Sequence, residues 1–400
     1  MLKGKNVILG VTGSIAAYKI ASLASALKKL SCNVDVIMTE NACNFINPIT
    51  FETLTGNKCL VDTFDRNFQY SVEHVSLAKK ADLFLVAPAS ANFIGKAANG
   101  IADDMLTTTF MACECKKIVS PAMNTRMFNN PVVKDNMKKL ESYGIDVINP
   151  ASGYLACGDT GEGKMPEPEV LISYILRELA HEKDMKGLKV CVTAGPTRET
   201  IDPVRFISNR STGKMGFALA KNAMERGADV TLVSGPVELK DVPFVKMVHV
   251  ESARQMFEAV TKEAETADII VKAAAVADYR PAVVADEKIK KKDGDMSIAL
   301  ERTDDIIGTL GKTKRDNLFL CGFSMETEHM LENSKAKLEK KNLDMIIANN
   351  VKVKGAGFGT DTNVVSLITK DEIKELPIMS KEDVADEIFN NILANRKGIV

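Results

Sequence analysis

One cysteine, Cys157, lies among glycines and polar residues in GYLACGDTG, at positions 153–161. Cysteines that only pack are usually buried in apolar surroundings, so this thiol occupies an unusual position. It is one of eight cysteines, which include no C-x-x-C pair, and the chain has only four histidines. These counts argue against a structural zinc site and, in a chain of 400 residues, against a disulfide framework. Cys157 is therefore a candidate for chemistry of its own.

Polar side chains follow the apolar strands of the first half. The turn GVTGSIAAYK, at positions 10–19, leads into a helix start, where N–H groups and the helix dipole favour a phosphate. A plain strand–helix turn is the alternative. Thr39 ends the next strand and could also hold a phosphate, while Ser90 and Asn92 lie beside small residues that would let a flat ring approach. Asn124 could orient a carboxylate, or it could cap a turn or helix.

His74 lies in VEHVSLA, beside apolar residues at helical spacing. A single histidine near an apolar face is more often structural than catalytic. These residues by themselves therefore favour a structural role for His74.

The second half has its own candidates in TAGPTRETIDPVRFISNRSTGKMG, at positions 193–216. Its STGKMG end is not a Walker phosphate loop, because it lacks the first glycine and the Ser or Thr after the lysine. The dense turn residues between a strand and a helix nevertheless favour an anion site over a solvated basic surface. The side chains that could gather there are Arg198, Arg205, Asn209, Arg210 and Lys214.

Later strand ends add further candidates. Asp278 ends a strand in AAAVADYRP and is suitably placed for ribose hydroxyls. Phe323, in GFSMETE, would stack on a base or pack in the core. Lys337 and Lys341 are four residues apart and so share one helix face. The lysine cluster EKIKKKDG, at positions 287–294, is most simply a solvated surface.

The elements that position these residues occur twice. Positions 3–10 and 186–195 both read as a basic lead-in, a buried strand and a glycine turn into a helix, and ADLFLVAPASAN at 81–92 has a counterpart in ADIIVKAAAVAD at 267–278. Buried strands alternating with helices predict parallel sheets covered on both faces. We expect an α/β protein with two Rossmann-like domains, 1–185 and 186–400, joined near the charged segment 177–186. Ligands bind such sheets at the carboxyl ends of the strands.

Composition excludes several function classes. The net charge of −1 gives no basic footprint for nucleic acid. No apolar run reaches the roughly 18 residues that cross a bilayer. The opening MLKGKNVILGVTG lacks the cleavage region of a signal peptide and runs straight into a strand. We therefore expect a cytoplasmic protein that binds neither nucleic acid nor membrane.

Taken in order, the motifs of residues 5–170 resemble the flavin-containing cysteine decarboxylases, and most specifically the phosphopantothenoylcysteine decarboxylases. The motifs are GVTGSIAAYK, EHVSLA, APASANFIGKAANGIADDML, PAMNTRMF and GYLACGDTGEGKMPEP. The resemblance implies a flavodoxin-like domain that binds FMN and acts on a peptide-like C-terminal cysteine. FMN oxidation of the Cα–S unit to a thioaldehyde would provide the electron sink that lets CO2 leave.

That resemblance also assigns roles to residues. His74 would serve the oxidative and decarboxylating step, Asn124 would hold the substrate carboxylate, and Cys157 would be a proton donor on a closing flap. A thiol with an ordinary pKa of about 8.5 is mostly protonated at neutral pH and can supply that proton. The FMN site would comprise Gly13, Ser14, Thr39, Ser90 and Asn92. Two residues depart from the family pattern, since Phe128 replaces Trp and Lys164 replaces Arg.

Residues 186–395 resemble the phosphopantothenate–cysteine ligases, through DPVRFISNRSTGKMG, AAVADYRP, EKIKK and KKNLD. This resemblance implies CTP as co-substrate and Mg2+, whose protein ligands it leaves unknown. Arg205 and Asn209 would contact an acyl-cytidylate, and Lys288 would assist the chemistry. Met325 replaces a small residue of the family. The residues implied for CTP binding are Asp278, Lys288, Asp304, Asp305, Ile306, Ile307, Phe323, Lys337 and Lys341.

Together the two resemblances imply a bifunctional enzyme of coenzyme A biosynthesis, which joins 4′-phosphopantothenate to L-cysteine and decarboxylates the product to 4′-phosphopantetheine. They also imply a homo-oligomer with trimeric decarboxylase and dimeric ligase contacts, which together suggest a dodecamer. Two alternatives stay open. One is a flavin-binding regulatory subunit, because relatives of the first domain include proteins that inhibit a phosphatase. The other is a chain in which only one half is active.

Overall fold

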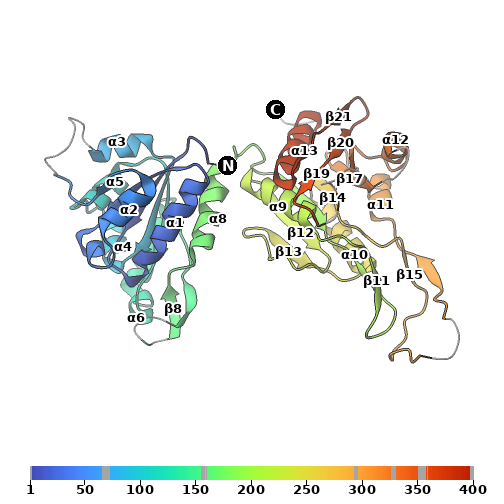
Figure 1. The fold of residues 1–400 in the computed structure, drawn as a ribbon, viewed down its shortest axis with the longest axis horizontal. Coiled ribbons are helices and arrows are strands. Elements are labelled where there is room, and N and C mark those ends of the chain that lie inside the picture. Colours follow the sequence, from blue (N-terminus) through green and yellow to red (C-terminus); the bar gives the residue numbers. More distant parts are fainter. Residues whose placement is uncertain are drawn as a thin grey trace. The chain divides into compact units, whose positions relative to one another are not determined.

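The computed structural model describes residues 2–64, 73–154, 158, 160–291, 296–325, 330–349, 357 and 359–396. The chain divides into two compact units, Met1–His181 and Glu182–Val400 (Figure 1). Each unit has an α/β architecture with its own central sheet and its own hydrophobic core. Within the described ranges, no helix is long and apolar enough to cross a membrane.

The first unit is built on a six-stranded sheet whose strands are all parallel, in the order β3-β2-β1-β4-β5-β6. The strands are β1 (Asn6–Val11), β2 (Asn33–Met38), β3 (Cys59–Leu60), β4 (Leu83–Ala89), β5 (Lys116–Pro121) and β6 (Asp146–Val147). The helices are α1 (Tyr18–Lys29), α2 (Pro48–Thr55), α3 (Glu73–Lys80), α4 (Ala91–Ala98), α5 (Met105–Ala112), α6 (Thr125–Phe128), α7 (Pro131–Ser142) and α8 (Pro168–Leu179). Short 3-10 turns, η1 (Ile15–Ala17) and η2 (Glu40–Asn44), follow β1 and β2.

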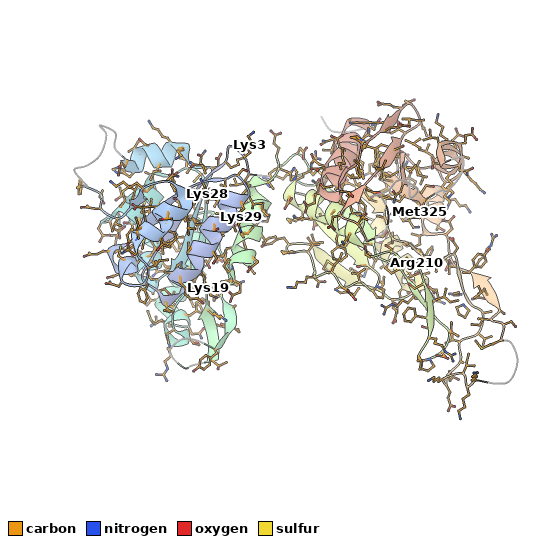
Figure 2. All side chains as sticks on the ribbon, viewed as in Figure 1. Lys3, Lys19, Lys28, Lys29, Arg210 and Met325 are labelled. Carbon is orange, nitrogen blue, oxygen red and sulfur yellow. The ribbon has the colours of Figure 1, made fainter. Side chains whose placement is uncertain are left out.

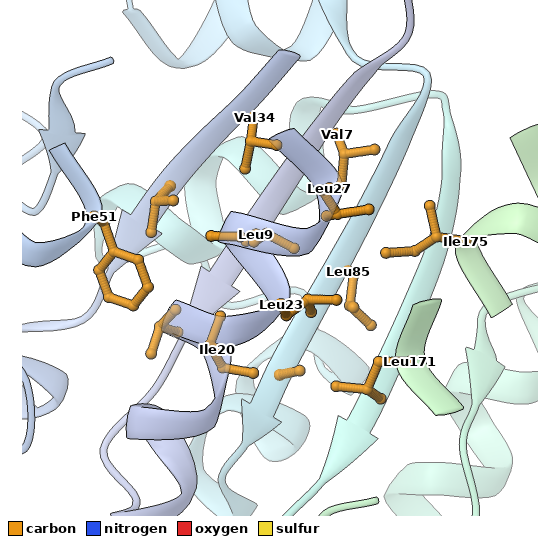
Figure 3. Close-up of a cluster of buried hydrophobic side chains, with 14 of the residues drawn as sticks. Val7, Leu9, Ile20, Leu23, Leu27, Val34, Phe51, Leu85, Leu171 and Ile175 are labelled. Carbon is orange, nitrogen blue, oxygen red and sulfur yellow. The ribbon is translucent and has the colours of Figure 1, made fainter. Parts of the chain in front are cut away.

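Helices cover both faces of this sheet because alternate residues of each strand point to opposite sides. In β1, Val7 and Leu9 belong to the core under α1 and α8, whereas Ile8 belongs to the core on the opposite face. Figure 3 shows the first of these cores, where Leu23 and Leu27 of α1 and Leu171 of α8 pack over the sheet. The predicted parallel sheet with two covered faces is confirmed for this unit.

The second unit contains an eight-stranded sheet in the order β13-β12-β9-β14-β17-β18-β20-β21. Its strands are β9 (Lys189–Ala194), β12 (Asp229–Ser234), β13 (Lys246–His249), β14 (Ile269–Lys272), β17 (Phe319–Met325), β18 (Met345–Asn349), β20 (Val365–Ile368) and β21 (Ile373–Glu375). The helices are α9 (Lys214–Glu225), α10 (Ala253–Ala264), α11 (Ile306–Lys312), α12 (Met330–Lys340) and α13 (Lys381–Asn395). Short two-stranded sheets pair β10 (Arg198–Thr200) with β11 (Phe206–Ser208), β15 (Tyr279–Pro281) with β16 (Leu300–Arg302), and β19 (Thr362–Asn363) with β22 (Met379–Ser380).

Two features of the second unit differ from the prediction. Strands β20 and β21 run antiparallel at one edge of the sheet, so this sheet is mixed rather than parallel throughout. A short turn, in which the Thr369 N–H donates to the Glu372 carbonyl, joins them without the crossover helix that a parallel pair requires. Residues 194–216, which we expected to be a loop between a strand and a helix, contain the β10–β11 hairpin. The Asp202 carboxylate orders the hairpin turn by accepting from the N–H groups of Val204 and Arg205.

Glu225, at the end of α9, makes the stability of the second unit depend on pH. Burial raises the pKa of this carboxyl to about 7. An unfolded glutamate has a pKa of about 4.3, so folding takes up a proton between these values and stability falls as the pH rises through that window. We expect Glu225→Gln to raise the free energy of unfolding at pH 8 by up to about 3 kcal/mol, and by much less at pH 5. Urea unfolding at both pH values measures this difference. Glu265→Gln, at an exposed site, is the control, and equal gains at both pH values would contradict the assignment.

Candidate functional sites

The predicted flavin-site residues lie at one edge of the first sheet. They follow the carboxyl ends of the four central strands, which stand in the order β2, β1, β4, β5. Because the strands are parallel, these ends meet at a single edge. The residues are Gly13 and Ser14 after β1, Thr39 after β2, Ser90 and Asn92 after β4, and Asn124 after β5.

Three of these side chains are helix caps. The hydroxyl oxygens of Ser14, Thr39 and Ser90 each accept, at 3.3 Å, from a backbone N–H at the start of the element that follows. Each hydroxyl keeps its own O–H to donate. Gly13 is required by close packing, since a Cβ there would lie 2.9 Å from the Cβ of Asn41. The edge therefore presents hydroxyl donors and helix starts together, as a phosphate requires.

A cavity of about 530 Å³ opens at this edge. Ser14 lines it from the start of η1, and Asn124 lines it from the start of α6, where its Oδ1 accepts from the Arg126 N–H at 2.8 Å. Its other walls come from Tyr18, from Tyr154 and from residues 163–165. Gly13, Thr39, Ser90 and Asn92 lie at the same sheet edge but do not line this cavity.

A β-hairpin forms one wall of the cavity. Its strands, β7 (Ala151–Tyr154) and β8 (Thr160–Lys164), flank the position of Cys157, which itself lies outside the described residues. The hairpin is docked by the Met123 N–H, which donates to the Gly163 carbonyl at 3.1 Å. A Cβ on Gly163 would lie 2.3 Å from the Met123 carbonyl oxygen, and the Gly163 φ of +123° disfavours any side chain. Glycine is therefore the residue that allows this contact.

The base of the hairpin is held by two lysines. Lys164 lies 3.8 Å from the Glu167 carboxylate, and Lys19 of α1 lies 2.7 Å from the same group. The hydrogen bond from Lys19 holds the pKa of Glu167 below its usual range. Lys19 is labelled on α1 in Figure 2. Lys164 thus shares its carboxylate partner with a closer cation, so its charge contributes only part of the anchoring.

His74 and Phe128 are not brought into the cavity. His74 lies in α3 and is absent from the cavity lining, and α3 and β8 stand at opposite ends of the first unit in Figure 1. Phe128 is buried in the core at 5% exposure, with the Lys134 ammonium 3.6 Å from its ring centroid. Phe128 therefore fills the core with an aromatic ring, where an indole N–H is not needed.

A second cavity, of about 410 Å³, lies in the second unit. It is bounded by the start of α9 and by the ends of β14, β17 and β18, again at the carboxyl edge of a sheet. Gly216 lets α9 approach β9, since a Cβ there would lie 2.8 Å from the Thr193 carbonyl oxygen. Of the predicted residues, Asn209, Lys214, Asp278 and Phe323 line the cavity, as does Met325, which Figure 2 labels.

Two cavity lysines, Lys272 and Lys381, were missed by the sequence reasoning. Burial lowers the pKa of Lys272, as do Lys341 and Lys337, while Asp278 and Asp305 oppose the shift. Burial and Lys214 likewise lower the pKa of Lys381. The signal for Lys272 was a lysine in the last position of an otherwise apolar strand, where its ammonium must lie at the binding edge.

Arg205 and Lys288 belong to a separate arrangement. The Arg205 guanidinium lies 2.6 Å from the Asp202 carboxylate and donates to the Ile289 carbonyl. Asp202 also accepts from the Ile289 N–H at 3.1 Å. Burial alone would raise the pKa of Asp202, but the hydrogen bonds it accepts hold that pKa well below the usual range. Arg205 and Asp202 therefore fix the segment that carries the exposed Lys288.

The remaining predicted CTP residues lie outside the cavity lining. Asp305 caps α11 by accepting from the Gly308 N–H at 3.1 Å, and Lys341 lies 3.0 Å from its carboxylate. Ile306 and Ile307 are buried in the core, at 2% and 6% exposure, where their side chains pack with apolar neighbours. Asp304 and Lys337 are exposed. The roles of these residues in CTP binding stay predictions.

The described residues contain no cluster of three or more histidine, cysteine, aspartate or glutamate side chains that could hold a metal ion.

Asn209 donates from its side-chain amide to the Ala275 carbonyl at 2.9 Å, which links the end of β11 to the end of β14 at the cavity. Because Lys214, Lys272 and Lys381 and the start of α9 all line the second cavity, this cavity can bind a polyanion.

Comparisons with known proteins cover both units. A family model described as Flavoprotein matches residues 1–180, and one described as DNA/pantothenate metabolism flavoprotein C-terminal domain matches residues 185–395. The chain is 48% identical to the coenzyme A biosynthesis bifunctional protein CoaBC of Bacillus subtilis (strain 168), over 99% of this chain and 98% of that protein. It is 40% identical to CoaBC of Escherichia coli (strain K12), over 98% and 97%. A crystal structure of the C-terminal domain of CoaBC matches with 44% identity and a TM-score of 0.45, over 52% of this chain and 95% of that one.

Proposed function

Because this chain belongs to the CoaBC family of bifunctional coenzyme A biosynthesis proteins, we propose that its two units catalyse consecutive reactions. The second unit ligates 4′-phosphopantothenate to L-cysteine with CTP and Mg2+. The first unit then decarboxylates the product to 4′-phosphopantetheine with FMN. The same family membership supports a cytoplasmic location.

The observation that carries the ligase proposal is the cationic cavity at the carboxyl edge of the second sheet. Lys214, Lys272 and Lys381 line it from three different elements. A carboxylate does not react with an amine at neutral pH, so it must first be activated. Attack of the 4′-phosphopantothenate carboxylate on the CTP α-phosphate forms an acyl-cytidylate and releases pyrophosphate, and attack by the cysteine amine then releases CMP. The lysines stabilise the negative charge that develops on the phosphates.

The acidic and aromatic residues at this cavity fit the remainder of a nucleotide. Asp278 is exposed at the cavity wall and can accept from ribose hydroxyls, and Phe323 can stack on the base. Mg2+ usually binds through substrate phosphates and retained waters, so it needs no dedicated protein cage. We therefore propose that Mg2+ enters bound to the CTP phosphates. Lys288, on the segment fixed by Arg205, would then approach the acyl-cytidylate.

The decarboxylase proposal rests on the first cavity. Ser14 and the start of η1 at its wall suit a phosphate, with Thr39 and Ser90 at the same sheet edge, and its volume of about 530 Å³ suits a flat ring with a substrate beside it. FMN supplies the two-electron oxidation that makes loss of CO2 possible. Asn124 binds the substrate carboxylate through its amide at the cavity wall. The β7–β8 hairpin carries Cys157 and closes over the substrate, so that the thiol can return a proton.

The position of α3 supports a homo-oligomer. His74 is remote from the cavity within its own chain, so a role in the reaction requires that a neighbouring copy supply it. Large apolar side chains are exposed on the first unit, including Ile15 at 57%, Tyr18 at 59% and Ile49 at 59%. A neighbouring copy that covers these side chains would remove their apolar surface from water. We therefore propose trimeric contacts between first units, with dimeric contacts between second units giving a dodecamer, and light scattering measures the assembly.

The test of the proposed function uses the full chain as purified. Incubation with 4′-phosphopantothenate, L-cysteine, CTP and Mg2+ is expected to release pyrophosphate, CMP and CO2, and mass spectrometry should find 4′-phosphopantetheine. Without CTP, both steps should stop. Added phosphopantothenoylcysteine should restore only the loss of CO2. Protein that retains bound flavin but gives neither ligation nor CO2 would refute the proposal and favour a flavin-binding regulatory role.

A further inference from the structure

Two cysteines, Cys113 and Cys115, lie away from both proposed active sites. They occupy the connection between α5 and β5, where β5 begins. The first active-site cavity lies beyond the other end of this strand, about 20 Å away for a strand of six residues. Neither cysteine lines that cavity. Any chemistry at this pair is therefore separate from the proposed decarboxylation.

The backbone holds the two thiols side by side. Cys113 ends α5 in an extended conformation, with φ −72° and ψ 136°. In extended backbone, residues two apart point to the same side, and these two thiols both line one surface cavity. Cys113 is buried at 3% exposure, whereas Cys115 is partly exposed. The pair therefore has one accessible thiol and one sheltered thiol within reach of it.

Both thiols line a surface cavity of about 800 Å³ with a positive rim. The charged residues of its lining are Glu114, Lys116, Lys117 and Lys139. Lys116 lies 2.6 Å from the Asp146 carboxylate, which offsets its charge. The two positive charges of Lys117 and Lys139 outnumber the single negative charge of Glu114, so the rim has a net positive charge. An anionic molecule entering this cavity is attracted toward Cys115.

The two thiols also differ in acidity. The neighbouring Cys113 thiol lowers the pKa of Cys115, and Lys117 lowers it further, although burial opposes both. The neighbouring Cys115 thiol and burial raise the pKa of Cys113. Cys43, which is partly exposed like Cys115, has a pKa raised by burial and by Glu40. Since the thiolate is the nucleophile in thiol chemistry, Cys115 is the more reactive of these two partly exposed thiols.

We propose that Cys115 is a thiol–disulfide exchange site for anionic low-molecular-weight disulfides, with Cys113 as the resolving thiol. The Cys115 thiolate attacks one sulfur of the disulfide, forms a mixed disulfide and releases the other half as a thiolate. The Cys113 thiol then loses its proton to solvent, and its sulfur attacks the Cys115 sulfur. This step forms a Cys113–Cys115 disulfide and releases the second half. In total, two protein thiols are oxidised and one small disulfide is reduced to two thiols.

The experiment exposes the full chain to glutathione disulfide, which is anionic, or to cystamine, which is a cationic disulfide. Tandem mass spectrometry of peptides follows Cys115 and compares it with Cys43. Glutathione disulfide is expected to modify Cys115 at least about threefold faster than cystamine does, with the ratio shrinking at high salt. At Cys43, beside Glu40, the preference should be absent or reversed. Equal charge preference at the two cysteines would overturn the proposal.

Variants at Cys113 test the resolving role. Wild type is expected to accumulate the Cys113–Cys115 disulfide, whereas Cys113→Ser should retain one glutathionyl group on Cys115. Cys113→Ala provides the same test without placing a hydroxyl in this buried position. If wild type and both variants hold the mixed disulfide equally, Cys113 does not resolve it and the proposal fails. Flavin absorbance serves as a check that each variant is folded.

Discussion

Lys272→Met is expected to lower the ligase kcat/KM by about 100-fold and to leave flavin content and decarboxylation unchanged. The reason is that Lys272 is half-buried and lines the cavity where the CTP phosphates would bind. Methionine fills a similar volume without charge, so the second unit should remain folded. Steady-state release of pyrophosphate measures the ligase. Decarboxylation of added phosphopantothenoylcysteine measures the first unit independently.

Lys312→Met is the matched control, since Lys312 is exposed on α11 and lies outside the cavity lining. It should change the ligase less than about twofold. The lowered pKa of Lys272 adds a pH signature. As the pH rises through that pKa, Lys272 loses its charge and the KM for CTP should increase, and Lys272→Met should lack this rise. An unchanged KM profile in the variant would show that Lys272 does not contact the phosphates.

Gly163→Ala is expected to reduce decarboxylation by at least about 100-fold, because the added Cβ would lie 2.3 Å from the Met123 carbonyl oxygen. The hairpin cannot then dock where the Met123 N–H reaches the Gly163 carbonyl, and the Cys157 that it carries is displaced from the substrate. The flavin should stay bound, since its proposed phosphate contacts are on other loops. The rate of CO2 release at saturating substrate, measured beside the flavin spectrum, checks both expectations.

Gly153→Ala supplies the comparison within the same hairpin. A Cβ at position 153 would lie 3.7 Å from Lys164 Cδ, which is ordinary contact, so decarboxylation should fall by less than about threefold. Similar losses in the two variants would mean that general disturbance of the hairpin, rather than its docking on Met123, sets the rate. Ligase turnover should be unaffected in both.

Local sequence signals predicted much of the fold. The apolar strands, the glycine turns and the charged joint predicted two α/β units, and the repeated pattern at 81–92 and 267–278 placed β4 and β14. Such signals can be read from a short stretch of sequence. A strand of a parallel sheet is buried on both faces, so nearly all of its residues are apolar. The antiparallel edge formed by β20 and β21 was not predicted, since strand direction depends on which neighbour is paired.

For the sites, the sequence by itself determined which residue types stand at the carboxyl ends of the strands, and so determined Ser14, Asn124, Asp278 and Phe323 as candidates. Only the tertiary structure decided which of them share a cavity. In the structure, Lys272 and Lys381 also line the second cavity, Ile306 and Ile307 are buried in the core, and Arg205 pairs with Asp202. The reason is that spacing along a chain sets the face and the strand end, whereas burial, pKa and partners depend on segments that are distant in sequence and meet only on folding.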